Sequence, residues 1–180
     1  MRPVPPFHQL HLIGMPGAGK TTLGRALAVA YEVPFLDLDE EITRREGRSV
    51  VDIFAVEGEA YFREREAAVL REVLQQPGSF VLATGGGTPC FHQNLEALLK
   101  KGLVLYLEVP VPELVRRILH TDATRPLLAA APTAEALSRR LDETLRARKQ
   151  FYARAPLCCT APSCTLEDVR RLLSAYQTTG

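Results

Sequence analysis

The sequence has no hydrophobic run that could cross a bilayer and no large excess of charge of either sign. Apolar runs such as Leu103–Leu107 fall far short of the roughly 20 residues that a membrane helix requires. The formal net charge is +1, from 22 basic and 21 acidic side chains, so no broad basic surface for nucleic acid is expected. The sequence therefore predicts neither a membrane partner nor a nucleic-acid partner, and any cationic site must be local.

Cysteine is scarce and forms no metal-binding pattern. The chain has no Cys-x-x-Cys pair and no histidine at a matching spacing, so a zinc site is not predicted. Residues 1–7 contain three prolines and no apolar core of signal-peptide length, and we expect them to form a frayed tail. These features predict a cytoplasmic protein with reduced thiols at its four cysteines, Cys90, Cys158, Cys159 and Cys164.

The length of 180 residues, with 46% apolar residues, indicates one domain over 1–180. Strands are expected at 10–13, 34–37, 80–83, 103–107 and 157–160. Helices are expected at 22–31, 40–46, 49–56, 59–75, 93–101, 112–120, 133–155 and 166–178, whereas 121–132 has little periodicity. This alternation without hairpin turns predicts an α/β fold with a parallel sheet covered on both faces, and ligands bind such sheets at the carboxyl ends of the strands.

Residues 14–21, Gly-Met-Pro-Gly-Ala-Gly-Lys-Thr, match the pattern of a phosphate-binding loop between a strand and a helix. The glycines let successive backbone N–H groups point at phosphate oxygens, and the helix start adds partial positive charge. Lys20 is expected to reach the β- and γ-phosphates and the Thr21 hydroxyl to bind magnesium. The alternative is an ordinary glycine-rich turn, but such a turn does not require Lys-Thr at its end.

Asp37 and Asp39 follow the second expected strand. Residues two apart in an extended segment point the same way, so both carboxylates can face one site. One can hold a magnesium-bound water, and the other can accept a proton from a substrate hydroxyl. An equally good interpretation is an acidic helix start, which the helix dipole favours.

A triple glycine, Gly85–Gly87, follows the third expected strand. Glycine runs cost conformational entropy, so this one indicates close approach of the backbone to a ligand, with a flexible turn as the alternative. Four arginines are candidates for binding anions, although most arginines in any chain are solvated surface residues. They are Arg63, Arg125, Arg148 and Arg154.

These motifs, in this order, resemble those of shikimate kinases over about residues 11–173. The matching segments are the 14–21 loop, Asp37-Leu38-Asp39, Gly47–Phe54, Gly58-Glu59-Ala60-Tyr61-Phe62-Arg63, Gly85–Gly87, Thr124-Arg125-Pro126-Leu127-Leu128, and Arg148 with Tyr152. The resemblance implies a three-layer fold like that of nucleoside monophosphate kinases, with a five-stranded parallel sheet and a mobile lid at 121–132. It also implies transfer of the ATP γ-phosphate to the 3-hydroxyl of shikimate by a magnesium-dependent monomer, a step of aromatic amino acid biosynthesis.

The resemblance also implies roles for individual residues. Lys20, Asp39 and Arg125 would be the catalytic residues, and Thr21 together with Asp37, through a water, would hold magnesium. The shikimate site would consist of Asp39, Arg63, Gly85, Gly86, Gly87 and Arg148, with the two arginines pairing with the carboxylate. ATP would contact Gly14, Gly17, Ala18, Gly19, Lys20, Thr21, Thr22, Arg117 and Arg125.

Departures from the family pattern leave alternatives open. The family segment Arg-x-Pro-Leu-Tyr matches Arg148 to Tyr152 without its proline, and Arg154 to Cys158 without its tyrosine; spacing favours Arg148. The loop at 161–165, which would contact adenine, matches weakly. A kinase for another hydroxylated acceptor, such as gluconate, is a second hypothesis. A regulatory ATPase using Glu108 is a third, whereas a GTPase switch would need an Asn-Lys-x-Asp motif that the sequence lacks.

Overall fold

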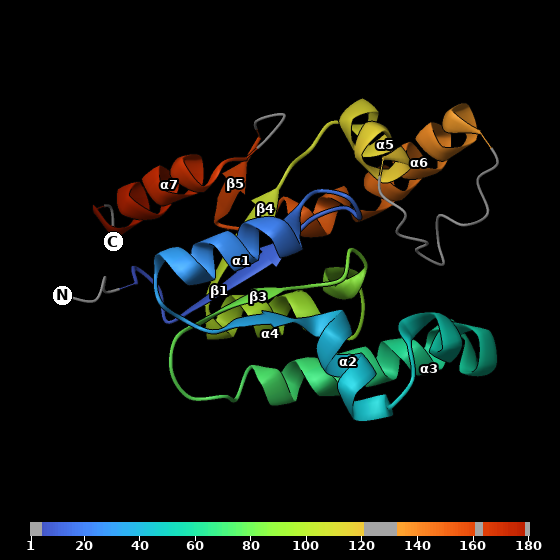
Figure 1. Ribbon diagram of the computed structural model, residues 1–180, viewed down its shortest axis with the longest axis horizontal. Helices are drawn as coiled ribbons and strands as arrows, with labels where there is room; N and C mark the ends of the chain where they lie inside the picture. The colour runs from blue at the N-terminus through green and yellow to red at the C-terminus, as the bar shows by residue number, and fades with distance from the viewer. Residues whose placement is uncertain (1–4, 121–132, 161–163, 179–180) are drawn as a thin grey trace.

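A five-stranded parallel sheet forms the centre of the protein (Figure 1). The computed structural model describes residues 5–120, 133–160 and 164–178. The strand order is β2-β3-β1-β4-β5, and every neighbouring pair is parallel. The predicted α/β fold is therefore confirmed. The strands are β1 (Gln9–Ile13), β2 (Phe35–Asp37), β3 (Phe80–Ala83), β4 (Leu103–Leu107) and β5 (Leu157–Cys159).

Helices lie on both sides of this sheet, with α1 in front of it and α4 behind it in the view of Figure 1. No helix in the described part of the chain is both long and apolar enough to cross a membrane. The expected helices are present, with ends shifted by up to three residues. A 3-10 turn, η1 (Thr88–Cys90), was not predicted. The α-helices are α1 (Lys20–Ala30), α2 (Leu38–Glu46), α3 (Val50–Val73), α4 (Asn94–Lys101), α5 (Val111–Leu119), α6 (Ala134–Tyr152) and α7 (Leu166–Thr178).

The central strands are buried because helices cover both faces of the sheet. Every residue of β1 and β3 is buried, and only Leu103 of β4 is partly exposed. Parallel strands of this kind consist largely of apolar residues without alternation. The core is therefore continuous from the sheet into both helical layers, and it fixes the carboxyl ends of β1, β2 and β3 relative to one another.

Helix α3 is interrupted where the sequence predicts a break between two helices. Gly58 has φ 81° and ψ 176°, which is not helical, and it separates the part that begins at Val50 from the part that ends at Val73. The first part is capped by the Ser49 hydroxyl, which accepts a hydrogen bond from the Asp52 amide at 3.1 Å. The prediction of two helical segments, at 49–56 and 59–75, is confirmed, and Gly58 forms the junction.

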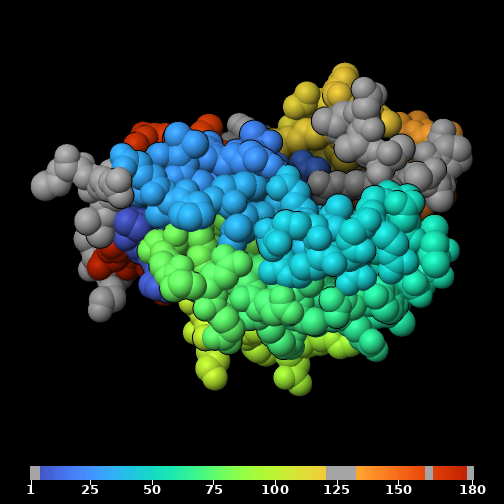
Figure 2. Space-filling model, turned by 60° about the horizontal axis from the view of Figure 1, so that its bottom comes forward, coloured from blue at the N-terminus to red at the C-terminus, as the bar shows by residue number. Residues whose placement is uncertain are grey.

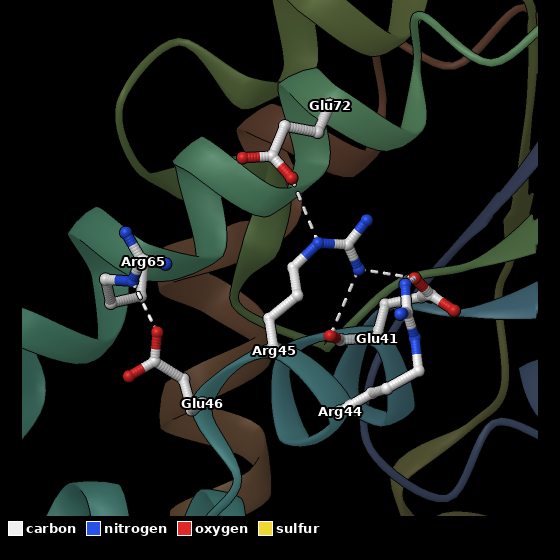
Figure 3. Close-up of polar contacts among 6 residues, drawn as sticks. All are labelled: Glu41, Arg44, Arg45, Glu46, Arg65 and Glu72. Carbon is white, nitrogen blue, oxygen red and sulfur yellow. Dashed lines mark hydrogen bonds and ion pairs between the residues drawn. The ribbon is translucent and has the colours of Figure 1, made fainter.

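Arginine side chains tie α2 to α3 (Figure 3). Arg45 of α2 pairs with Glu41 one turn earlier, and its Nε donates to Glu72 of α3 at 3.0 Å. Arg65 of α3 donates to Glu46 at the end of α2 at 2.6 Å, which lowers the pKa of the glutamic acid. The two helices form one continuous surface (Figure 2). The end of α2 is thereby tied to the second part of α3.

Two of the four cysteines are joined in a disulfide. Cys159, the last residue of β5, is bonded to Cys164, and their Cα atoms lie 6.0 Å apart, a usual separation for a bridge. The expectation of reduced thiols is wrong for this pair, because Cys164 lies beside the last residue of β5. Cys90 and Cys158 are free thiols.

His11 in β1 makes stability depend on pH. Its Nε2 lies 3.1 Å from Gln9 Oε1, and its Nδ1 has no hydrogen-bond partner among the described residues. Burial lowers the pKa of His11 from 6.5 to about 4, so the unfolded chain takes up this proton at a higher pH than the folded chain. We expect the free energy of unfolding to fall as the pH drops from 6.5 to 4, by on the order of 3 kcal/mol. Urea denaturation at pH 7.5, 6, 5 and 4 would measure this loss.

The variant His11→Gln should lose less stability over this range, because it cannot take up the proton. Replacing the exposed His8 by glutamine serves as the control and should leave the wild-type slope unchanged. Parallel stability curves for wild type and His11→Gln would show that His11 does not titrate on unfolding.

Candidate active site

The phosphate-binding loop joins the end of β1 to the start of α1. Gly19 is the N-cap of α1 with φ 94°, a left-handed conformation that suits glycine, and no described side chain caps the helix. The first N–H groups of α1 therefore face the loop, where an anion is stabilised by the helix dipole. Lys20 is buried, and its Nζ donates to the Gly14 and Met15 carbonyls at 2.8 and 2.9 Å.

A cavity of about 640 Å³ opens beside this loop. The loop forms one wall, and the half-buried Arg117 of α5 contributes to another. Arg117 Nη1 donates to the Ala18 carbonyl at 3.1 Å, and its Nε donates to Glu113 at 2.6 Å. The guanidinium is thus fixed next to the loop from an element 99 residues away. Thr21, Thr22, Asp37, Asp39 and Cys164 also line the cavity.

Asp37 and Asp39 reach the cavity in a different way from the one the sequence suggested. The extended geometry expected for this pair is wrong, because α2 begins at Leu38 and takes Asp39 into its first turn. Asp37 is the N-cap: its Oδ1 accepts from the Asp39 amide at 3.0 Å. The interpretation as an acidic helix start therefore holds for the backbone, while both carboxylates still line the cavity.

The Thr21 hydroxyl donates to Asp37 Oδ2 at 2.8 Å, so two oxygen ligands lie side by side at the cavity wall. Mg²⁺ prefers oxygen ligands and usually takes only one or two from the protein, with waters and phosphate oxygens completing its shell. A half-buried hydroxyl and a half-buried carboxylate next to a phosphate-binding loop fit this requirement.

The triple glycine brings the other predicted side chains together. A Cβ atom placed at Gly85 would lie 3.3 Å from Asp39 Oδ1, and one placed at Gly86 would lie 3.0 Å from Arg148 Nη1. At Gly87 it would lie 2.6 Å from Arg63 Nη2, so any side chain there would collide with the guanidinium. Three consecutive glycines thus each face a different charged side chain.

Arg63 is held between carboxylates and aromatic rings. Its Nη1 donates to Glu66 at 2.8 Å, and its Nη2 and Nε donate to Glu59 at 3.1 and 3.3 Å. The guanidinium carbon lies 4.4 Å from the centre of the Phe91 ring. Glu66 is fully buried, whereas the Glu59 side chain is 52% exposed. Arg63 therefore has one fixed partner and one that is free to turn into solvent.

Glu66 is a site residue that the sequence reasoning missed. Its second carboxylate oxygen accepts from the Thr88 hydroxyl at 2.6 Å, so it joins Arg63 to the turn that follows the triple glycine. A glutamate in the middle of a charged helix looks like a solvated residue. The available signal was its position three residues after Arg63, on the same side of α3.

Of the two alternatives for the second arginine, only Arg148 lies beside the glycine loop. Its Nη1 is buried and has no hydrogen-bond partner within the described ranges. Arg154 instead forms an ion pair with Glu96 at 2.6 Å, with both side chains about half exposed. The geometry therefore leaves a buried, unused N–H donor at Arg148 and none of this kind at Arg154.

The structure does not place every remaining candidate. Arg125 and the 121–132 segment fall outside the described residues, as do 161–163 of the expected adenine loop. Glu108 is not among the cavity-lining residues in the described part of the chain, and its amide donates to the Cys159 carbonyl at 3.0 Å.

The fold and the site define a P-loop nucleotide-binding protein with a second, cationic site beside the phosphate loop. The family model for shikimate kinase matches residues 16–177. The chain belongs to the shikimate kinase family.

Individual relatives agree with this assignment. The chain is 47% identical to a shikimate kinase of Bordetella pertussis over 143 residues, which is 79% of this chain and 65% of that protein. It thus spans about two thirds of that relative. It is 42% identical to a shikimate kinase of Methylococcus capsulatus over 173 residues, covering 95% and 93% of the two chains. The structure of shikimate kinase from Acinetobacter baumannii in complex with shikimate superposes with a TM-score of 0.85 at 36% identity, covering 96% and 94%.

Proposed function

We propose that this protein transfers the γ-phosphoryl group of ATP to the 3-hydroxyl of shikimate, giving shikimate 3-phosphate and ADP. The observation that carries the proposal is the triple glycine, which gathers Asp39, Arg148 and Arg63 next to a phosphate-binding loop. A small acid with several hydroxyls needs cationic groups at its carboxylate and acceptors at its hydroxyls. This site offers both.

The nucleotide would bind in the cavity beside the loop. Its phosphates would take the backbone N–H groups at the start of α1, with Lys20 at the transferring phosphate and Arg117 toward the base. Thr21 would ligate Mg²⁺ directly and Asp37 through a water. Magnesium would neutralise charge on the β- and γ-phosphate oxygens. Arg125 keeps its predicted role as a cation supplied to the phosphates.

The acceptor would bind between Arg63, Arg148 and Asp39. Its carboxylate would take the free Nη1 donor of Arg148 and displace the exposed Glu59 from Arg63, while Glu66 keeps that guanidinium in place. Asp39 would accept a hydrogen bond from the reacting hydroxyl and then its proton. The Gly85–Gly87 backbone would form the floor, since it has no side chains to fill the space.

The proposal also covers the compartment, the oligomeric state and the partners of the enzyme. It would act in the cytoplasm as a monomer, on two small-molecule substrates and without nucleic acid. A kinase for a sugar acid such as gluconate would use the same phosphate loop, but it would not need two arginines at one carboxylate together with Asp39. A regulatory ATPase would hydrolyse ATP without any acceptor.

One assay separates these activities. With Mg²⁺ and ATP, we expect ADP release to depend on shikimate and not on gluconate, with shikimate 3-phosphate as the product. Arg63→Lys should raise the KM for shikimate at least tenfold, because an ammonium group cannot offer the bidentate fork. Arg154→Lys, at the surface ion pair, is the matched control and should behave as wild type. The absence of shikimate 3-phosphate would rule out the proposed reaction.

A further inference from the structure

Tyr152, the last residue of α6, is fully buried and hydrogen-bonded to the triple glycine. Its hydroxyl donates to the Gly86 carbonyl at 2.6 Å, across 66 residues of sequence. Its ring stacks on that of Tyr106 in β4, with the ring centres 5.0 Å apart and the planes at 24°. The stacked pair fixes the ring, so the hydroxyl has little freedom to move away from Gly86.

This bond is the long-range anchor of a segment that has no side chains of its own. The Gly85 carbonyl accepts from the Thr88 amide at 3.2 Å, and the Gly87 carbonyl accepts from the Cys90 amide at 2.9 Å. Both of these bonds lie within the local turn. Among the described residues, only the middle carbonyl is bonded to a distant helix. Because glycine has the greatest backbone freedom, the position of Gly86 depends strongly on this bond.

The same helix presents Arg148, one turn before Tyr152. Its buried and unpartnered Nη1 lies 3.0 Å from a Cβ atom placed at Gly86. Burial raises the pKa of Tyr152 to about 12, with the nearby Arg148 charge opposing the shift, so the hydroxyl stays protonated and donates. Arg148 and Tyr152, from the same helix, thus both lie beside Gly86.

We propose that Tyr152 is a positioning residue for the phosphate acceptor. Its hydroxyl holds Gly86, and with it the two flanking glycines that face Asp39 and Arg63. Tyr152 thereby keeps Asp39, at the hydroxyl end of the acceptor, at a fixed separation from the arginines at its carboxylate end. That separation would select an acceptor of matching length. This inference rests on the proposed function, since it concerns the same site.

The test is a pair of matched variants. Tyr152→Phe and Tyr106→Phe each remove one hydroxyl from the same stacked pair, but only the first hydroxyl is bonded to the glycine loop. Tyr152→Phe leaves a buried carbonyl unsatisfied, so we expect its KM for shikimate to rise about tenfold. Its KM for ATP should change less than twofold, and Tyr106→Phe should leave both KM values unchanged.

A second measurement does not depend on activity. Amide hydrogen exchange at Thr88 and Cys90, the donors of the local turn, should be faster in Tyr152→Phe than in Tyr106→Phe, at equal global stability. An unchanged KM for shikimate in Tyr152→Phe, equal effects on both KM values, or equal exchange in the two variants would overturn the inference. If the wild type does not phosphorylate shikimate, the proposed function fails, and the exchange rates alone decide whether Tyr152 anchors the loop.

Discussion

Lys20→Ala is expected to lower the turnover of phosphoryl transfer by 10²-fold or more. Transfer depends on stabilising negative charge that develops on the phosphate oxygens, and removing one preorganised donor from such a site typically has an effect of this size. In the free protein the Lys20 ammonium is already held by the Gly14 and Met15 carbonyls. The ammonium is therefore held against the loop in which the phosphates would bind. Steady-state kinetics with ATP and shikimate would measure the loss.

Lys101→Ala is the control for this variant. It removes the same side chain from an exposed position in α4, where Nζ contacts Gln75 at 3.3 Å. It should retain wild-type turnover. Thermal unfolding of both variants should remain cooperative, which separates a loss of chemistry from a loss of fold. A Lys20→Ala enzyme with more than a tenth of wild-type turnover would contradict the role of Lys20.

Asp39→Asn should leave the fold almost unchanged while turnover falls by about 10²-fold or more. The structure separates the two roles that the sequence left open, because Asp37, and not Asp39, caps α2. The change therefore removes no cap and costs only part of a favourable helix-dipole interaction, typically below about 1 kcal/mol. An amide, by contrast, is a poor base and can turn a donor toward the acceptor hydroxyl. Single-turnover transfer and ATP titration would measure the two effects.

Glu40→Gln is the matched control for Asp39→Asn. It neutralises a carboxylate in the same first turn of α2, but the Glu40 side chain is 63% exposed and pairs with Arg25. The two variants should lose similar, small amounts of stability, and only Asp39→Asn should lose turnover. Equal turnover in both would show that Asp39 merely adds charge to the helix start and that another residue handles the acceptor.

Most of the fold could be predicted because its signals are local. The strand at 80–83 and the strand at 103–107 were predicted to the residue, since each is a short apolar run bounded by glycine or by polar turn residues. The break in α3 was visible as Gly58. The start of α2 was not, because Asp37 is both the last residue of β2 and the N-cap of α2, so no turn residues separate the strand from the helix.

Less of the candidate site could be predicted, because many of its contacts join residues far apart in the sequence. The phosphate loop is contiguous, so its residue types and spacing define it without any tertiary information. The positions of Glu66 and Tyr152 depend on contacts across 22 and 66 residues, to Thr88 and Gly86 respectively. No periodicity reveals such pairs, because they arise only when the helices dock on the sheet. The spacing already favoured Arg148 over Arg154, but its buried Nη1 beside Gly86 became visible only in the packing of α6.

The strand order has a consequence for how the chain is made. The first strand to be synthesised, β1, lies in the middle of the sheet, between β3 and β4. Gln9 pairs with Phe80, 71 residues later, and Leu10 pairs with Leu103, 93 residues later. A nascent chain therefore carries a largely apolar strand that has no partner until β3 is made, and it pairs on both edges only after β4, when more than half of the chain has been synthesised. Such non-local pairing slows folding and leaves hydrophobic surface open to chaperones in the meantime.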